Sequence, residues 1–255
     1  MRVPRALSAV LLPVAGIALW YTLTGSGLIG TIILPGPWAV AKAMVNELGF
    51  AKGNIWGAIG YSMAKAIVSF LIASTLGITI GLSMGASPKI YDTCFFSVDF
   101  LRSIPATAIF PFFVLTLGVG FESHVAYVSF PCIWINTISA LYGVRHASAV
   151  RREMAHVFRA SKGQVFRWVI LPDALPYIAG GLRLSASISL LMVIAAEMLI
   201  GSAAGLGKAI QEAHSTLRLA EMYGLIIVTG LLGYALNRVL LTIEKHVVHW
   251  TGKDY

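Results

Sequence analysis

Apolar residues occur along this chain in long, nearly continuous runs that are separated by short polar segments. The runs do not alternate with polar positions, so they favour helices over the strands of a barrel. A helix that spans a bilayer needs about 20 mainly apolar residues, and the pattern therefore predicts an all-α chain with about six transmembrane helices. The predicted spans cover residues 7–23, 56–84, 90–117, 125–144, 177–200 and 222–243.

The segment between the first two predicted spans, residues 24–54, has a different character. Glycine and proline interrupt it, and only a short amphipathic helix, at Pro37–Leu48, is expected there. The first apolar run follows Arg2 and Arg5, as it does in a secretory signal peptide, but further spans follow this one. We therefore interpret it as an uncleaved first span.

Composition narrows the class of protein. The chain has 255 residues, of which 57% are hydrophobic and 12% are charged, and its mean hydropathy is +0.80. Soluble domains carry roughly 25% charged residues, so a soluble enzyme is excluded. Two cysteines are too few for a disulfide scaffold. We expect residues 1–255 to form a single polytopic transmembrane domain.

The net charge of +8 is unevenly distributed. Six of the nineteen Lys and Arg residues fall between Arg145 and Arg167, and the apolar runs on either side leave no room for a nucleic-acid-binding domain. Basic residues are typical of cytoplasmic loops. With the N-terminus inside, eleven basic residues lie in inner segments and four in outer ones. This bias predicts that both termini and the loop 145–176 are cytoplasmic.

The basic loop carries a helical pattern of its own. Val150, Met154, Val157 and Phe158 recur at the spacing of one helix face. This spacing predicts a short helix with an apolar face outside the bilayer.

A second helix is expected after a turn. Ser161 and Gln164 have the spacing of a capping box, and Pro172 and Pro176 are expected to interrupt the return to the membrane. Such a hairpin can lie on anionic lipid headgroups or dock onto a cytoplasmic partner. The pattern alone leaves both alternatives open.

Several stretches resemble the binding-protein-dependent import permeases of ABC transporters, in the branch that handles nitrate, sulfonates, taurine and bicarbonate. Three of them resemble the EAA motif, the loop that fits a groove on the ATPase subunit: Glu153-Met154-Ala155, Arg159-Ala160-Ser161 and Ile170-Leu171-Pro172. Further matching stretches include Arg102-Ser103-Ile104-Pro105, Gly180-Gly181-Leu182-Arg183, Ala195-Ala196-Glu197-Met198 and Gly205-Leu206-Gly207.

The resemblance implies a type I ABC importer permease fold with cytoplasmic coupling helices between spans four and five. It implies a homodimer in the bacterial inner membrane, two ATPase subunits that carry ATP and magnesium, and a periplasmic or lipid-anchored binding protein. The solute would be a small anion such as a sulfonate, taurine or nitrate. The chain lacks a phosphate-binding loop and zinc-like spacings, so neither catalysis, a cofactor nor a metal is expected in it. The expected ATPase-coupling residues are Glu153, Met154, Ala155, Val157, Phe158, Arg159, Ala160, Ser161, Leu171 and Pro172.

Two positions depart from the EAA pattern. Met154 stands where the motif has its first Ala, and Arg159 stands where it has Gly. A glycine at that place suits a left-handed turn that closes a helix. We expect Arg159 either to accept this strained conformation or to end the helix differently.

Charged residues within the spans are candidates for the translocation pathway or its gate, because such residues are costly in lipid. Asp99 and Arg102 can pair on one helix face, and Ile104-Pro105 is expected to kink that helix. Lys65 and Glu197 can pair across two spans. Either pair can equally be structural.

Arg183 lies near the inner end of the fifth predicted span. Its side chain is expected to extend toward the membrane surface.

The alternative function is a stand-alone secondary transporter or channel that uses the intramembrane charges as ion or proton groups. The loop 145–176 argues against this alternative, because a self-contained transporter needs no two-helix docking element.

Overall fold

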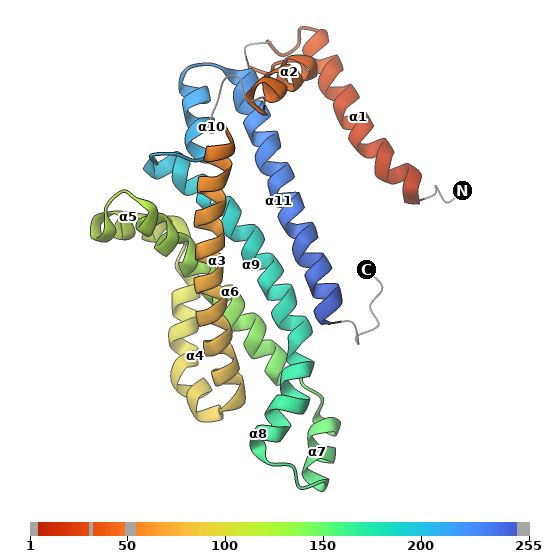
Figure 1. Ribbon diagram of the computed structural model, residues 1–255, viewed down its shortest axis with the longest axis vertical. Coiled ribbons are helices and arrows are strands. Elements are labelled where there is room, and N and C mark those ends of the chain that lie inside the picture. The colour runs from red at the N-terminus through yellow and green to blue at the C-terminus, as the bar shows by residue number, and fades with distance from the viewer. Residues whose placement is uncertain (1–4, 31–32, 49–54, 249–255) are drawn as a thin grey trace.

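Four long helices form the body of the protein. The computed structural model describes residues 5–30, 33–48 and 55–248, and within these residues the chain forms helices joined by turns. The long helices are α3 (Ile55–Ala86), α6 (Phe121–Arg145), α9 (Leu171–Ile200) and α11 (Leu219–Val247), as Figure 1 shows. They lie where the sequence predicts the second, fourth, fifth and sixth spans.

The sequence predicts about six spans, and four or five candidates are found among the described residues. Among the described residues, four helices are long and apolar enough to cross a membrane, and one bent helix pair makes up to five. Helix α1 (Arg5–Gly25) covers the predicted first span, but its described apolar stretch, Leu11–Gly25, is shorter than a full crossing. The fold is therefore all-helical with four to five candidate spans.

The third predicted span is wrong as a continuous helix. It consists of α4 (Pro88–Ser103) and α5 (Ala106–Leu117), whose axes are bent by 92°. Ile104 and Pro105 are extended, with ψ values of 122° and 125°. A residue before proline avoids the helical region, and proline lacks the N–H that would continue the ladder. The expected kink is present, but it is a full break.

The close contact of α3 with α6 depends on glycine. A Cβ atom on Gly77 would lie 2.5 Å from the Ile133 carbonyl oxygen, and one on Gly81 would collide with the Thr137 carbonyl. Small residues allow membrane helices to approach closely, so dispersion contacts can hold them together. This packing makes α3 and α6 the rigid centre of the molecule.

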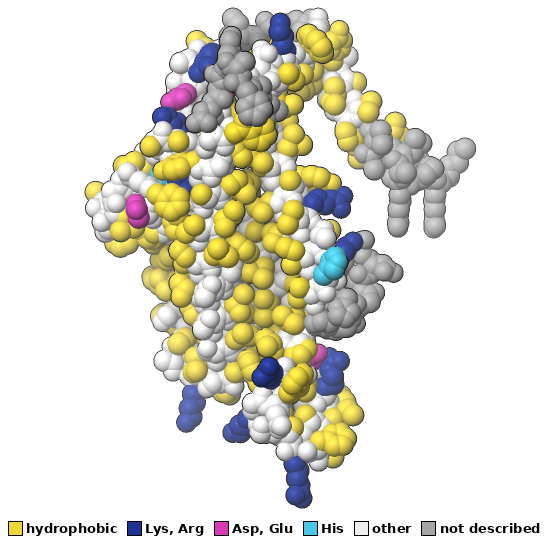
Figure 2. Space-filling model, viewed as in Figure 1, with side chains coloured by type: hydrophobic (Ala, Val, Ile, Leu, Met, Phe, Trp, Pro, Cys, Tyr) yellow, Lys and Arg dark blue, Asp and Glu magenta, His cyan; other side chains and the backbone are white. Residues whose placement is uncertain are grey.

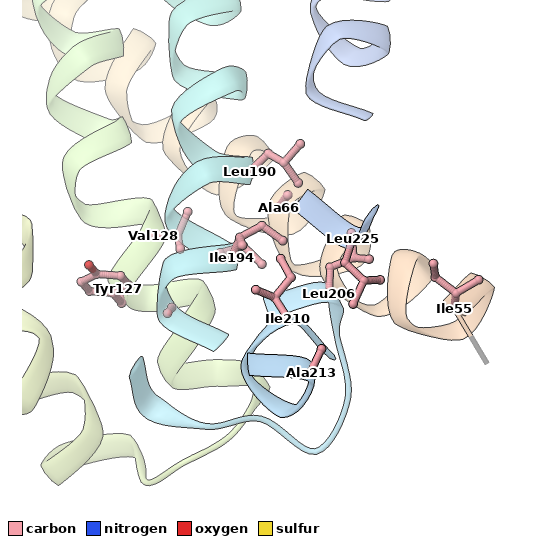
Figure 3. Packing of buried hydrophobic residues seen from close by; sticks show 12 residues of the cluster. Ile55, Ala66, Tyr127, Val128, Leu190, Ile194, Leu206, Ile210, Ala213 and Leu225 are labelled. Atoms are coloured by element: carbon pink, nitrogen blue, oxygen red, sulfur yellow. The ribbon is translucent and has the colours of Figure 1, made fainter. Parts of the chain in front are cut away.

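The largest apolar core lies toward one end of the bundle. Short helices α2 (Pro37–Leu48) and α10 (Leu206–Ser215) cover this end, at the top of Figure 1. Figure 3 shows Ile194, Leu206, Ile210 and Leu225 converging there from α9, α10 and α11. Helix α2 has the bounds that the sequence predicts.

The opposite end carries the basic loop. Helices α7 (Ala149–Val157) and α8 (Lys162–Val165) project below the bundle in Figure 1. Figure 2 shows Lys and Arg side chains protruding at this lower end, while apolar side chains cover the flank above it. The chain therefore has the surface of a membrane protein whose polar loop lies outside the apolar belt.

The expected interruption at Pro172 and Pro176 is wrong. A single helical run, Lys162–Ile200, extends for 39 residues from the loop to the far end of α9. Between α8 and α9 the residues Phe166–Ile170 form a wider π-helical turn, in which the Leu171 N–H donates to the Phe166 carbonyl. This wider turn precedes Pro172 and changes the local ladder, so the missing proline donor does not end the helix.

Candidate functional site

The projecting loop presents an apolar surface to its surroundings. Val150, Met154, Val157 and Phe158 of the predicted face are all exposed, and Phe158 is 80% exposed. Trp168, on the π-helical turn, is exposed as well. Exposed apolar groups clustered outside the lipid belt indicate a docking surface. We name these five residues the loop surface.

Arg159 accepts the left-handed conformation that the motif glycine would adopt. Its φ is 54°. The Ala160 N–H donates to the Ala155 carbonyl at 3.0 Å, and the Arg159 N–H donates to the His156 carbonyl at 2.9 Å. These two bonds are those of a Schellman motif. The loop thus keeps the glycine turn at a cost of about 1 kcal/mol.

The predicted capping box is confirmed at the start of α8. The Ser161 N–H donates to Gln164 Oε1 at 2.8 Å, and the Gln164 N–H donates to Ser161 Oγ at 3.4 Å. Val165 then buries its side chain. This cap and anchor hold the second half of the loop against the bundle.

Asp173 is a loop residue whose role the sequence did not reveal. Its Oδ2 accepts the Ser148 N–H at 2.9 Å, and its Oδ1 accepts a hydrogen bond from Arg151 Nη2 at 2.6 Å. These bonds fix the start of α7 to the head of α9. The available signal was an acid between Pro172 and Ala174 in a basic loop, but its partners lie 22 and 25 residues away.

The remaining predicted coupling residues surround these elements. Glu153 is exposed and makes no ion pair or hydrogen bond within the described ranges. Ala155, Ala160, Leu171 and Pro172 are half-buried. The loop is therefore held in place by the hydrogen bonds of Asp173 and Ser161, while Glu153 and the loop surface are exposed.

Lys65 and Glu197 pair across α3 and α9, as the sequence allows. Lys65 Nζ lies 3.0 Å from Glu197 Oε1, and neither side chain is exposed. Lys65 also donates to Ser202 Oγ at 2.8 Å. The Ser62 hydroxyl lies 2.8 Å from Glu197 Oε2. Each buried charge thus has more than one polar partner, which buried ions require.

The stretch Gly205-Leu206-Gly207 brings the start of α10 onto this carboxylate. The Gly207 N–H donates to Glu197 Oε2 and the Leu206 N–H donates to Ser62 Oγ, both at 2.9 Å. Gly205 has φ +131°, and a Cβ there would collide with the Glu197 carboxylate. The two glycines are therefore needed for close approach. We name Ser62, Lys65, Glu197, Ser202 and the start of α10 the outer brace.

Asp99 and Arg102 also pair as predicted, but in a different environment. Arg102 Nε and Nη2 donate to Asp99 Oδ1 at 2.8 and 2.6 Å. The side chains of Asp99 and Arg102 are 46% and 49% exposed. The helix break at Ile104 and Pro105 follows directly. Both exposed charge and irregular backbone are tolerated at membrane depth where they line water or protein.

Arg183 forms an ion pair that the sequence did not predict. Its Nη1 lies 3.3 Å from Glu244 Oε2 on α11. The side chain thus forms an ion pair between α9 and α11, because α11 places an acid opposite it.

Comparison with known proteins covers most of the chain. Residues 73–253 match the family model described as binding-protein-dependent transport system inner membrane component. The taurine transport system permease protein TauC of Escherichia coli (strain K12) is 29% identical over 93% of this chain and 87% of its own length. The nitrate import permease protein NrtB of Synechocystis sp. is 32% identical over 73% of this chain and 68% of its own.

A solved structure shares the fold. A chain of the MetNI methionine ABC transporter, in an inward-facing conformation, superposes with a TM-score of 0.64. The match covers 76% of this chain and 95% of that chain at 17% identity. This similarity supports the all-helical fold.

Proposed function

Because this chain belongs to the family of binding-protein-dependent transport system inner membrane components, we propose that it forms the pathway for a small anion in an ATP-driven importer. Family membership makes it a multi-pass permease subunit of a bacterial ABC importer, in the sulfonate, taurine, nitrate and bicarbonate branch. The subunit itself is neither catalytic nor a cofactor carrier. The family also implies a partner ATPase and a binding protein.

The loop surface is the observation that carries the proposal. Its apolar side chains are exposed on a segment that Asp173, Ser161 and Val165 hold in place. An ATPase subunit would bury them in a groove. Two copies of this chain would meet two ATPase subunits, on which ATP and magnesium bind, and a binding protein would deliver the solute at the opposite end.

The continuous helical run Lys162–Ile200 supplies a mechanical link for alternating access. One end carries part of the loop surface and the other end carries Glu197 of the outer brace. A movement of the loop on ATP binding would therefore reach the far end of the bundle through one rigid element. The bias between states comes from the different affinities of ATP and of the loaded binding protein for each state.

The membrane topology follows from the same proposal. Helix α1 has 21 residues, which is about 30 Å of helix, so it serves as a first span in this proposal even though its described apolar stretch, Leu11–Gly25, is shorter than a full crossing. The broken pair α4 and α5 serves as the third, which gives six. The excess of Lys and Arg in the segments of one side favours an inner-membrane orientation with both termini cytoplasmic.

The chemistry of the relatives supports an anionic solute. Their names specify taurine and nitrate, and both molecules carry an oxyanionic group. Arg102, half-exposed at the helix break, is suited to such groups.

The proposal is tested by reconstitution. The chain, its co-expressed ATPase and the binding protein are placed in liposomes, and uptake of radiolabelled taurine and nitrate is measured with and without ATP. Phe158→Ala is expected to lose ATPase co-purification and uptake, whereas Trp38→Ala, an equally exposed residue of α2, should keep ATPase co-purification. Uptake driven by an ion gradient in liposomes without any ATPase would instead establish the secondary transporter.

A further inference from the structure

A cavity of about 570 Å³ lies beside the helix break between α4 and α5. The break forms one wall, α6 forms a second, and Leu184 of α9 contributes to a third. Its lining residues with polar side-chain groups are Arg102, Ser103, Trp134 and Ser139, and its apolar walls include Phe130, Ile135 and Ile138. The cavity wall thus contains one positively charged group, and apolar side chains form much of the rest.

Arg102 retains hydrogen-bonding capacity toward this cavity. Its Nε and Nη2 both donate to Asp99 Oδ1, while Nη1 makes no hydrogen bond or ion pair within residues 55–248. The carboxylate fixes the orientation of the guanidinium. A guanidinium held in this way binds an oxyanion well, because its donors are already aligned.

Trp134 lies in the wall of the same cavity. Its ring packs against Phe130, with centroids 5.8 Å apart. Its Nε1 atom is buried and has no hydrogen-bond partner among the described residues, so other atoms of the residue face the cavity. An indole in the wall can report binding in the cavity through its fluorescence.

We propose that this cavity is a weak binding site for an organic oxyanion. The oxyanionic head lies at Arg102, and an apolar body lies against Phe130, Trp134 and Ile138. The volume and the apolar walls suit a sulfonate with a short alkyl chain better than a bare inorganic anion. Asp99 keeps the affinity low, as passage through a pathway requires. Its place on the route of transport rests on the proposed function.

The site is tested on the full-length chain in lipid nanodiscs, without ATPase or binding protein. Butanesulfonate is titrated while tryptophan fluorescence is recorded, with butylammonium as the oppositely charged control and nitrate as the headgroup without a body. We expect a saturable change with butanesulfonate, a weaker one with nitrate and none with butylammonium. The change should vanish in Trp134→Phe, which removes the reporter.

Two variants of the ion pair separate binding from folding. Arg102→Gln should weaken butanesulfonate binding about tenfold, as expected for the loss of charged hydrogen bonds, while Arg238→Gln, at an arginine that bonds to Tyr234 on α11, should bind normally. Asp99→Asn should tighten binding, because it removes a repelling charge and frees two donors. A purely structural pair would not give this opposite response.

The outcomes are distinct. An equal fluorescence change in the parent chain and in Trp134→Phe, or equal effects of butanesulfonate and butylammonium, overturns the site. Absence of binding while ATP-driven uptake persists overturns the site alone. Saturable binding without any ATP-driven uptake retains the cavity as a site and overturns the importer.

Discussion

Two ion pairs within the apolar body of this protein have the same chemistry and opposite surroundings. Lys65 and Glu197 are completely buried and are 132 residues apart in sequence. Their further polar partners are Ser62 on α3, Ser202 before α10 and the Gly207 N–H on α10. Asp99 and Arg102 are three residues apart, are about half exposed and have a helix break beside them. The first pair ties segments together, and the second stands at an open surface.

The difference shows how burial decides the role of a charge in a membrane protein. A buried ion needs several donors or acceptors to offset its desolvation, and those partners fix the surrounding helices. An exposed pair cannot face lipid without large cost, so it indicates contact with water, solute or a partner. We therefore infer that the outer brace is structural and that Asp99 and Arg102 line the pathway.

The largest effect is expected from breaking the outer brace. Glu197→Met leaves Lys65 buried without its counter-ion and should destabilise the protein by about 3–5 kcal/mol. The measurement is the free energy of unfolding in mild detergent, followed by denaturant titration. The double variant Lys65→Met, Glu197→Met removes both charges and should recover part of the loss. An unchanged stability in Glu197→Met would contradict the structural role.

The close approach of α10 to Glu197 gives a second, smaller effect. Gly205→Ala combines a strained φ with a Cβ that collides with the carboxylate, and it should cost about 1–3 kcal/mol. Gly201→Ala is the matched control, because Gly201 has φ +82° but nothing within 4 Å of its added Cβ. Equal losses in the two variants would show that the carboxylate contact contributes nothing.

For the exposed pair Asp99 and Arg102, we expect a small effect on stability and a clear effect on uptake. Asp99→Asn is expected to change the free energy of unfolding by less than about 1 kcal/mol, since exposed ion pairs contribute little. Its uptake rate at low solute concentration should nevertheless change clearly in the reconstituted transporter. A large loss of stability with normal uptake would make this pair another brace.

The smallest effect on stability is expected in the loop, far from both ion pairs. Arg159→Gly relieves the left-handed strain but adds freedom to the unfolded chain, so it should stabilise the protein by at most about 1 kcal/mol. A pull-down should show that ATPase assembly is preserved or improved. Loss of assembly in this variant would mean that the arginine side chain itself contacts the ATPase.

The sequence predicted the features that depend on local pattern. Continuous apolar runs located α3, α6, α9 and α11, and the spacing of Ser161 and Gln164 predicted the capping box. The pairing of Asp99 with Arg102 follows from their separation of three residues. The sequence also allowed Lys65 and Glu197 to pair across two spans, but it did not decide between a pathway role and a structural one.

Other features that depend on distant contacts were not predicted. The partners of Asp173 come from a segment that only the folded loop brings near. The extent of the break at Ile104 and Pro105 could not be derived from the proline alone, because Pro172 and Pro176 lie within a continuous helix. Wider π-helical pairing before Pro172 accommodates the missing donor there, and no local signal distinguishes the two cases.

Water access at the two ion pairs tests most directly whether Asp99 and Arg102 line the pathway while Lys65 and Glu197 are structural. In a chain with Cys94→Ser and Cys132→Ser, single thiols are introduced as Ser103→Cys, beside Arg102, and as Ser62→Cys, beside Glu197. Intact membranes are treated with a charged, membrane-impermeant methanethiosulfonate, and labelling rates are compared. Rapid labelling is expected at position 103, and none is expected at position 62. Labelling at position 62 with protection at position 103 would contradict these roles of the two pairs.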